Sequence, residues 1–296
     1  MKRRRRLAGL ISGVLRVALR RRPRTAGVIL AAGSSTRMGG DVPKQFLSVC
    51  GVPILIRSVR AFDACSAVDE IVIVTRECDL QAVKNLCLEY KISPKLKTVI
   101  AGGDTRQKSA FLGVEAASNS CSFVAIHDAA RCLVTPDAIR SVLDVAYRRR
   151  AATAVYPVTD TVKRVDGRGR IKETLDRTEL RAAATPQAFD RDFYIAVAAY
   201  AEKKGTVVTD DNALFEAVGQ TVYTVPCDGD NFKVTTKSDL IRAEATVRAR
   251  ESKENDELES DTVTTFTDLR KGDRSSSAAS RSCTTGGCSV IPTPTC

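Results

Sequence analysis

Residues 25–40 read TAGVILAAGSSTRMGG, and this stretch decides the fold. The small and β-branched residues at 27–31 predict a buried strand, which leads directly into a loop of Ala, Gly and Ser. Small residues let a main chain approach a ligand closely, and the N–H groups of such a turn can cradle phosphate oxygens. In open α/β sheets, ligands lie beyond the carboxyl ends of the strands, where this loop emerges. The stretch therefore indicates an α/β fold with a phosphate-binding turn after its first strand.

The loop itself differs from the two commonest phosphate-binding loops. It lacks the Gly-Lys-Ser/Thr of a Walker loop and the G-x-G-x-x-G of a dinucleotide-binding turn. Arg37 and Lys44 follow within a few residues, and Pro43 stiffens the approach to Lys44. Cations on a transferring phosphoryl group stabilise the charge that develops in its transition state. The pattern favours a polyphosphate site over an ordinary βα turn with two solvated surface cations.

Short β-branched runs alternate with amphipathic stretches through the rest of the chain to about residue 250. This alternation predicts βαβ units and a Rossmann-like, mainly parallel sheet. Strands are expected at 27–31, 70–75, 96–100, 122–127, 152–157 and 221–225. Helices are expected at 54–63, 80–90, 105–117, 136–148, 191–204, 210–218 and 237–250, and Thr135 is the expected N-cap before Pro136.

One segment breaks the alternation. Residues 159–177 read TDTVKRVDGRGRIKETLDR, in which Asp166-Gly167 and Gly169 are turn formers between alternating polar and apolar residues. This is the pattern of a β-hairpin inserted into an α/β fold. A polar hairpin has little core of its own, so we expect it to pack on a partner subunit.

Composition and charge divide the chain into three parts. Its 296 residues are 43% hydrophobic and 27% charged, which suits one sizeable α/β domain with tails or two small domains. We expect a basic leader at 1–24, one folded domain at 25–250 and a disordered tail rich in Ser, Thr and Gly at 251–296. No apolar run in the chain is long enough to cross a bilayer.

The basic leader holds ten Lys or Arg residues and no acid, so it supplies nearly all of the net charge of +11. The folded part is close to neutral and has no electrostatic footprint for a specific nucleic acid. The leader fits a dispensable tail, a membrane-surface helix or an organellar targeting peptide. A secretory signal is disfavoured because its apolar stretch is broken and ends in a second Arg cluster. We favour the dispensable tail.

The ten cysteines form no CxxC pair. Seven lie in apolar or helical contexts and are expected to act as small buried hydrophobes in a reducing, cytoplasmic compartment. Cys283, Cys288 and Cys296 lie in the tail, where their spacing does not support a zinc site. Metal binding or disulfides there remain alternatives to an unstructured tail.

Several motifs in order along the chain resemble one family. They are LAAGSSTRMGGDVPKQF at 30–46, HDAAR at 127–131, VTDTVKR at 158–164, ATPQAF at 184–189, TDDNALFE at 209–216 and GDNFKVT at 229–235. Together they resemble the 2-C-methyl-D-erythritol 4-phosphate cytidylyltransferase family of the non-mevalonate isoprenoid pathway, over about residues 27–249. The opening loop is shared by many nucleotidyltransferases that act on sugars, and the later motifs are more specific. The resemblance implies a nucleotide-diphospho-sugar transferase type of fold.

The resemblance also implies a site for CTP and catalytic cations. Arg37, Lys44 and Lys233 match cations that stabilise the reacting α-phosphate. The loop AGGDTR at 101–106 is similar to a cytosine-reading loop. The residues that would contact the nucleotide are Ala31, Ala32, Gly33, Gly103, Asp104, Ser109 and Asp128.

By the same resemblance, Asp128 and Asp230 would hold a Mg²⁺ ion, which prefers one or two carboxylates together with phosphates and water. Acceptor-binding positions are Thr161, Arg177, Thr185 and Arg131. Arg177 lies at the end of the arm, which in the family reaches across a homodimer, and its guanidinium can grip a phosphate bidentately. Cys132 stands where the family pattern usually has Pro, a change that we expect to be mild.

Two tempting groups receive no catalytic role. His127 is the only histidine, and a lone histidine is more often structural than catalytic. Asp210 and Asp211 resemble a metal pair, but acids in the first turn of a helix suit its dipole, and we expect them there.

The predicted reaction joins the CMP part of CTP to a small polyol phosphate and releases pyrophosphate. The acceptor phosphate is already an oxyanion at neutral pH, so positioning and charge neutralisation suffice. A ribitol 5-phosphate cytidylyltransferase is the near alternative, because it shares the fold and the nucleotide loop. A non-catalytic nucleotide-binding regulator, and a membrane or nucleic-acid adaptor driven by the leader, are alternatives of other classes.

Overall fold

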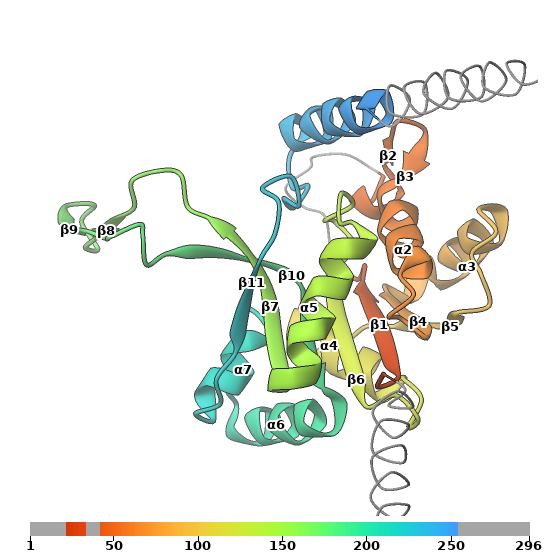
Figure 1. The fold of residues 1–296 in the computed structure, drawn as a ribbon, viewed down its shortest axis with the longest axis horizontal. Helices are drawn as coiled ribbons and strands as arrows, with labels where there is room; N and C mark the ends of the chain where they lie inside the picture. The colour runs from red at the N-terminus through yellow and green to blue at the C-terminus, as the bar shows by residue number, and fades with distance from the viewer. Residues whose placement is uncertain (1–21, 34–41, 254–296) are drawn as a thin grey trace, which may run out of the picture. The chain divides into compact units, whose positions relative to one another are not determined.

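The computed structural model describes residues 22–33 and 42–253, and a seven-stranded sheet lies at their centre (Figure 1). Its order is β11-β7-β10-β6-β1-β4-β5. β10 runs antiparallel to β6 and β7, and the other neighbours run parallel. The mainly parallel α/β sheet expected from the sequence is therefore confirmed. Its strands are β1 (Thr25–Leu30), β4 (Glu70–Thr75), β5 (Leu96–Ala101), β6 (Phe123–Asp128), β7 (Ala151–Pro157), β10 (Arg181–Asp190) and β11 (Tyr223–Pro226).

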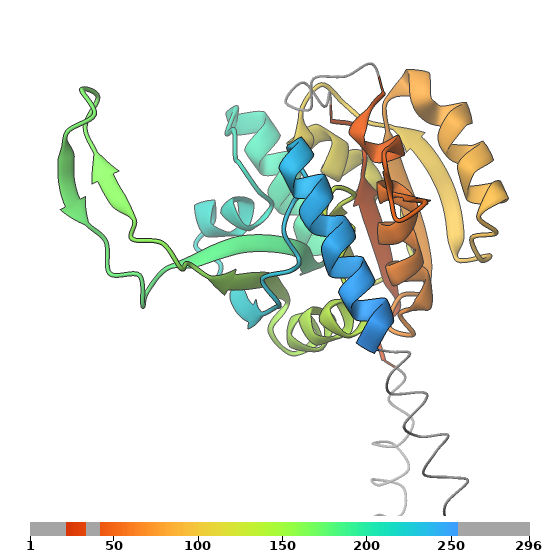
Figure 2. The same ribbon diagram turned by 90° about the horizontal axis from the view of Figure 1, so that it is seen from above.

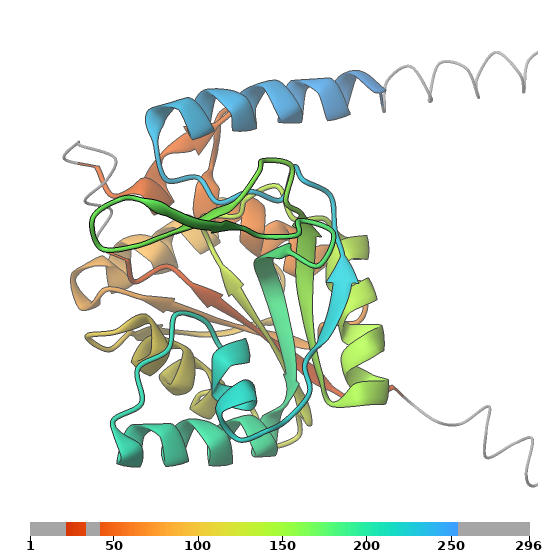
Figure 3. The ribbon, with the colours of Figure 1, turned by 90° about the vertical axis from the view of Figure 1, so that its left-hand side faces the viewer.

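Helices cover both faces of this sheet, because successive side chains of a strand point to opposite sides. In β1, Ile29 belongs to a core cluster with residues of α2, α3 and α5, whereas Val28 and Leu30 belong to a cluster with residues of α4, α6 and α7. Figure 3 shows α5 on one side of the sheet and α4 on the other. The helices are α2 (Ile54–Ala64), α3 (Leu80–Glu89), α4 (Arg106–Glu115), α5 (Pro136–Arg149), α6 (Arg191–Lys204) and α7 (Asn212–Ala217).

Helix α4 contacts the sheet at Gly113, where there is no room for a side chain. A Cβ atom there would lie 2.4 Å from Val28 Cγ1 and 2.7 Å from Val74 Cγ2. The Thr105 side chain caps the helix by accepting a hydrogen bond from the Lys108 N–H, as Thr135 does for α5 from Ala138 N–H. The contact at Gly113 packs α4 against β1 and β4.

A smaller apolar cluster lies beside the same strand ends. It joins the β2–β3 pair (Ser48–Val49 and Val52–Pro53) to Cys132, Phe232 and Val234. Ala243 and Val247, from a helix that begins at residue 237, complete it. This cluster fixes the segment around Phe232, whose neighbour Lys233 was predicted to be catalytic.

The described chain begins at the opposite, amino ends of the strands. Arg22 forms an ion pair with Asp69, with 2.7 Å between Nη1 and Oδ2, and Nη2 donates to the Ser66 carbonyl. Asp69 also accepts from the Thr25 N–H at 2.8 Å. These contacts tie residues 22–25 to the amino ends of β1 and β4.

The hairpin predicted at 159–177 projects from the sheet as an arm (Figures 1 and 2). β8 (Lys163–Val165) pairs antiparallel with β9 (Ile171–Thr174). Asp166 Oδ1 accepts hydrogen bonds from the N–H groups of Arg168 and Arg170, which shapes the turn, and Gly169 has a φ of 77°. The side chains of Val165 and Ile171 are 53% and 64% exposed. The arm thus has no core of its own within this chain.

The sequence did not predict β10, the one antiparallel strand of the sheet. Its residues, RAAATPQAFD, include four alanines and a proline, which have low strand propensity, and its pairing with β7 shifts register between Ala183 and Gln187. Tertiary pairing on both sides overrides this weak local signal. Helix α7 also begins two residues later than expected, at Asn212.

The ends of the chain lie mostly outside the described residues, and so does Arg37. The chain divides into a unit of residues 1–247 and a unit of residues 248–296, and the described part of the second, 248–253, is helical. No helix among the described residues is long and apolar enough to span a membrane. Of the described cysteines, four are buried, two are partly buried and Cys78 is exposed.

Candidate active site

A pocket of about 380 Å³ lies at the carboxyl ends of β1 and β6, where the sequence predicted a ligand. Distant segments of the chain supply its walls. Its lining contains nine of the predicted site residues: Ala31, Ala32, Gly33, Lys44, Gly103, Asp104, Ser109, Asp128 and Lys233. The fold therefore brings these residues to one hollow, although they are spread over two hundred positions of sequence.

The predicted base-reading loop is held tightly against the loop after β1. Gly102 N–H donates to the Thr75 carbonyl at 2.8 Å, and the Gly103 N–H donates to Ser109 Oγ at 3.1 Å. A Cβ atom on Gly102 would lie 2.6 Å from Ser109 Oγ and 2.8 Å from Ala32 Cβ, so only glycine fits. The loop presents fixed backbone groups to the pocket, which suits recognition of a flat ring by main-chain contacts.

Asp128 is the charged centre of the pocket. Its Oδ2 lies 2.7 Å from Lys233 Nζ, and its Oδ1 lies 3.3 Å from Arg106 Nε. Burial alone would raise the pKa of this carboxyl, but Arg106 and Lys233 outweigh burial and hold the pKa well below its usual range. Asp128 is therefore an anion that both cations share.

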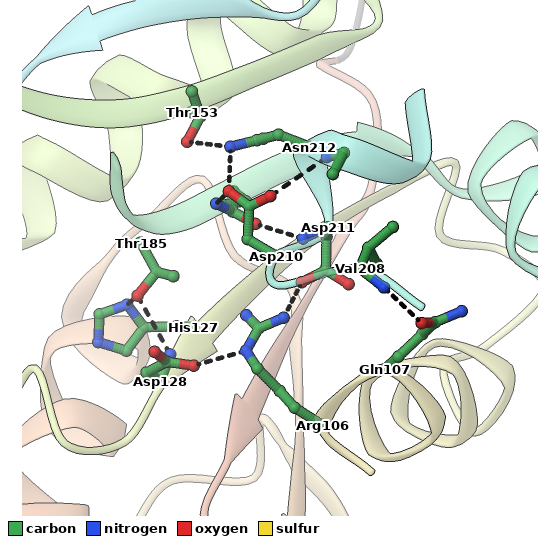
Figure 4. Close-up of polar contacts among 12 residues, drawn as sticks. Arg106, Gln107, His127, Asp128, Thr153, Thr185, Val208, Asp210, Asp211 and Asn212 are labelled. Carbon is green, nitrogen blue, oxygen red and sulfur yellow. Dashed lines mark hydrogen bonds and ion pairs between the residues drawn. The ribbon is translucent and has the colours of Figure 1, made fainter. Parts of the chain in front are cut away.

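Arg106 lines the pocket, and no role was predicted for it. Its Nη1 lies 2.8 Å from Asp211 Oδ2, so one guanidinium joins two carboxylates (Figure 4). Burial alone would lower the pKa of Arg106, but Asp211 and Asp128 outweigh burial and hold the pKa above its ordinary value. Arg106 begins α4 directly after the capping Thr105, and Asp211 precedes α7. No local pattern could have revealed a pair that lies 105 residues apart.

The two neighbouring aspartates behave differently. Asp210 Oδ1 accepts from the Ala213 N–H in the first turn of α7, as predicted for a helix N-terminus. Asp211 is 1% exposed, and besides Arg106 it accepts from the Tyr194 hydroxyl at 2.8 Å. Burial raises the pKa of Asp211, although Arg106 and Tyr194 oppose this. The helix-turn interpretation thus describes Asp210 and is incomplete for Asp211.

His127 lies under the pocket and is fully buried. Its Nδ1 is 2.9 Å from Thr185 Oγ1 and its Nε2 is 3.2 Å from the Arg131 carbonyl, while its ring packs against Phe62. Burial lowers the pKa of His127 to about 4. Its partners are residues of the protein interior, and the absence of a catalytic role stays a prediction.

Arg131 and Thr185 lie beside Asp128, but beneath the pocket lining. Thr185 Oγ1 accepts from the Asp128 N–H at 3.1 Å. Arg131 Nη1 donates to the Asn231 carbonyl at 2.9 Å, and the Asn231 side-chain amide donates to the Thr185 carbonyl at 2.8 Å. Asp230 is half-buried next to Asn231 in the chain. This network connects the ends of β6 and β10 to the segment that carries Lys233.

Five described residues that were predicted to belong to the site do not line the pocket: Arg131, Thr185, Asp230, Thr161 and Arg177. Thr161 and Arg177 belong to the arm. Both lie exposed on the segments that lead into and out of the arm. Arg177 Nη1 donates to the Thr159 carbonyl at 3.0 Å. Neither residue lines the pocket of its own chain.

Metal-binding chemistry at the pocket is limited to few carboxylates. Among the described residues, no group of three or more His, Cys, Asp or Glu side chains could hold a metal ion. Asp128 offers a carboxylate at the pocket wall, and Asp230 is the other predicted ligand. A donor set this small fits Mg²⁺, which takes one or two carboxylates and completes its shell with phosphates and water, and does not fit zinc.

The comparisons with known proteins all lead to one family. The family described as "IspD: 2-C-methyl-D-erythritol 4-phosphate cytidylyltransferase" matches residues 25–249. A protein of that name from Caldanaerobacter subterraneus is 38% identical over 223 residues, covering 75% of this chain and 98% of the relative. The Synechocystis protein of that name is 40% identical over 226 residues, covering 76% and 98%.

Solved structures agree with the sequence relatives. The "4-diphosphocytidyl-2C-methyl-D-erythritolsynthase" from Anaerococcus prevotii has a TM-score of 0.69 at 27% identity and covers 76% of this chain and 96% of its own. The 2-C-methyl-D-erythritol 4-phosphate cytidylyltransferase from Thermus thermophilus has a TM-score of 0.61 at 31% identity and covers 76% and 99%.

Proposed function

The chain belongs to the 2-C-methyl-D-erythritol 4-phosphate cytidylyltransferase family, and from this premise we propose that it joins CTP to 2-C-methyl-D-erythritol 4-phosphate. The products are 4-diphosphocytidyl-2-C-methyl-D-erythritol and pyrophosphate. The observation that carries the proposal is one pocket, which Lys44 and Lys233 line together with the loops after β1 and β5.

We expect the nucleotide to bind in one orientation. The rigid loop at Gly103 and Asp104, with Ser109 behind it, would read the cytosine through backbone groups. Ala31, Ala32 and Gly33 would contact the ribose and phosphates, because small residues permit a close approach. Asp128, held between two cations, would bind the ribose side of the nucleotide and contribute to the metal site.

The transfer itself is an in-line displacement. An oxygen of the acceptor phosphate forms a bond to the α-phosphorus of CTP, and the bond from that phosphorus to the pyrophosphate oxygen breaks. Lys44 and Lys233 would neutralise the charge on the α-phosphate as the bonds exchange. Arg37, which lies outside the described residues, is assigned the same role by its place in the motif. No strong general base is needed, since the attacking oxygen is already ionised.

A divalent cation, Mg²⁺, would be held by Asp128 and Asp230 and would add positive charge at the phosphates. The site has one apparent difficulty, because Asp128 already contacts both Arg106 and Lys233. These contacts would keep the carboxylate ionised and in place, ready to exchange one cation for another.

The acceptor would be bound by Thr185 and Arg131 near the pocket and by Thr161 and Arg177 from an arm. Because Thr161 and Arg177 do not line the pocket of their own chain, the arm of a second copy is the natural source. We therefore propose a homodimer formed through residues 159–177, whose exposed Val165 and Ile171 would be buried there. We propose a cytoplasmic location, since curated relatives of this chain are bacterial, with organellar targeting by the leader as the alternative.

One assay separates this proposal from its rivals. Purified protein is incubated with CTP, Mg²⁺ and either methylerythritol phosphate or ribitol 5-phosphate, and pyrophosphate release is followed. Release of pyrophosphate with methylerythritol phosphate supports the proposal. Release with ribitol 5-phosphate alone would mean that ribitol 5-phosphate is the acceptor. CTP binding without release from either acceptor would identify a nucleotide-binding regulator instead. A variant that lacks residues 1–21 and keeps full activity would exclude an essential role for most of the leader.

A further inference from the structure

A chain of charges leads from the interior of the protein to the pocket. Tyr194 donates to Asp211, Asp211 pairs with Arg106, Arg106 contacts Asp128, and Asp128 pairs with Lys233. The first two members do not line the pocket, and the last three do. Figure 4 shows the Arg106 side chain extended between Asp128 and Asp211.

Asp211 is fixed from three directions. One carboxylate oxygen accepts from the Tyr194 hydroxyl, the other accepts from Arg106, and the Asp211 N–H donates to Gln187 Oε1 at 3.1 Å. Tyr194 is itself completely buried against Phe189 and Phe215. A carboxylate buried to this degree is costly unless a cation compensates it, so Asp211 restrains the position of Arg106.

The rigid guanidinium passes this restraint to the pocket. Its planar fork fixes the direction of Nε once Nη1 is bound. Arg106 Nε then faces Asp128 Oδ1, which leaves Asp128 Oδ2 directed at Lys233. The orientation of the Asp128 carboxylate, and with it the place of the Lys233 ammonium, therefore depends on a residue that the substrates do not reach.

We propose that Asp211 is a positioning residue, which acts through Arg106 and Asp128 to hold Lys233 in its catalytic place. This inference rests on the proposed function, which gives Lys233 its catalytic role. It adds Asp211, a residue that does not itself contact the reacting groups. A plainer explanation is that Asp211 only anchors the 205–211 loop to α4. Gln107 also anchors that loop, because its side chain bonds the Thr206 carbonyl and the Val208 N–H.

Asp211→Asn and Gln107→Ala form a matched pair of variants. Asn keeps the size of Asp and an oxygen for Tyr194 but removes the charge that holds Arg106, whereas Gln107→Ala loosens the same loop and leaves the charges in place. We expect Asp211→Asn to lower kcat about tenfold or more, since small misplacements of catalytic groups are costly. Its KM for CTP should change less than about threefold, because the main-chain groups of residues 31–33 and 103–104 are not altered. Gln107→Ala should keep kcat within about twofold of the wild type.

A second readout does not need transferase activity. Lys233 is labelled with an amine-acylating reagent in the full-length protein, and the rate is compared by peptide mass spectrometry with that of exposed Lys237. In Asp211→Asn, Lys233 should react several-fold faster, because Asp128 engages it less well. Tyr194→Phe, which removes only the hydroxyl on Asp211, should give a smaller change in the same direction, and it serves if Asp211→Asn folds poorly.

The outcomes distinguish the possible failures. If the wild type releases no pyrophosphate, the proposed function fails, and the acylation rates still decide whether Asp211 positions Lys233. Equal acylation and equal kcat in Asp211→Asn and wild type would overturn the inference. An effect of Gln107→Ala as large as that of Asp211→Asn would reduce Asp211 to a loop anchor.

Discussion

The nucleotide pocket and the β8–β9 arm are built on opposite plans. In the pocket, Asp128 and the cations beside it come from distant segments, and the partner of each charge lies within the same chain. In the arm, the two short strands pair only with each other, and apolar Val165 and Ile171 face outward. One chain is thus sufficient to assemble the pocket that we propose for CTP. Thr161 and Arg177, which we propose for the acceptor, lie on the arm, whose apolar side chains we expect a second copy of the chain to cover.

The largest effect is expected in the pocket, for Lys44→Ala. Loss of one group that stabilises transition-state charge typically lowers turnover by about 10²–10³. We expect a fall in kcat of that size, measured by pyrophosphate release, with CTP binding by calorimetry largely kept. Lys203→Ala, on the exposed last turn of α6, is the matched control and should be silent. Normal turnover in Lys44→Ala would remove Lys44 from the reaction.

The arm side is tested by placing charge on its apolar face. Burial of a Val or Ile side chain contributes about 1.5–3 kcal/mol, so Val165→Asp with Ile171→Asp should weaken self-association by roughly a hundredfold or more. Light scattering should show a shift towards monomer, while CTP binding stays intact. Leu88→Asp, at a 77% exposed position on α3, controls for the added charge. A dimer that survives the double change would place the interface elsewhere.

A smaller effect is expected at the residue that would join the two regions. Arg177→Ala should raise the KM for the acceptor by about 10–100-fold, because a hydrogen bond to a charged group is worth about 1.5–3 kcal/mol. The KM for CTP should not change. Steady-state kinetics with each substrate varied in turn measures both. Weakened CTP binding with normal acceptor binding would contradict the division of labour between arm and pocket.

The smallest effect concerns the floor of the pocket. The folded protein lowers the pKa of His127 to about 4 from an ordinary value of 6.5, so near pH 5 the unfolded chain takes up a proton that the folded protein does not. This contribution to stability is complete above the unfolded pKa and is lost as the pH falls towards the folded one, by about 2 kcal/mol between near-neutral pH and pH of about 5. Urea unfolding at the two pH values, compared with His127→Gln, measures it.

The single imidazole also gives a direct test by NMR. Its ring signals should not titrate between about pH 5 and pH 8, since the pKa lies below that range. Titration of His127 near its ordinary pKa would mean that water reaches the floor of the pocket. The pocket would then differ less from the exposed arm.

The sequence was a good guide wherever the signal was local. β4 and α6 begin and end at the predicted residues, and the other predicted elements are displaced by a few residues at most. β10 was not predicted because its alanines and Pro186 have low strand propensity. This segment forms a strand only because β6 and β7 pair with it on both sides. Long buried runs and capped helices need no such context, which is why they were readable.

The site divides in the same way. The loop after β1, the 101–106 loop and Lys233 were found from motifs and line the pocket. Arg106 and Asp211 both lie in motifs of the family resemblance, but their pairing, across 105 residues of sequence, leaves no local pattern. Such pairs are set by tertiary packing, and a single sequence carries no record of them. The roles of Thr161, Arg177 and Asp230 stay predictions from the family resemblance.

The attachment of Arg22 at the amino ends of the strands has a practical side. β1 spans six residues, or roughly 20 Å at about 3.3 Å per residue, and it separates that attachment from the substrate entrance. A purification handle, fluorophore or surface tether fused ahead of Arg22 would therefore leave from the face remote from the entrance. Immobilised protein prepared in this way should remain open to nucleotide, whereas a label on the loops beside Lys44 would obstruct it.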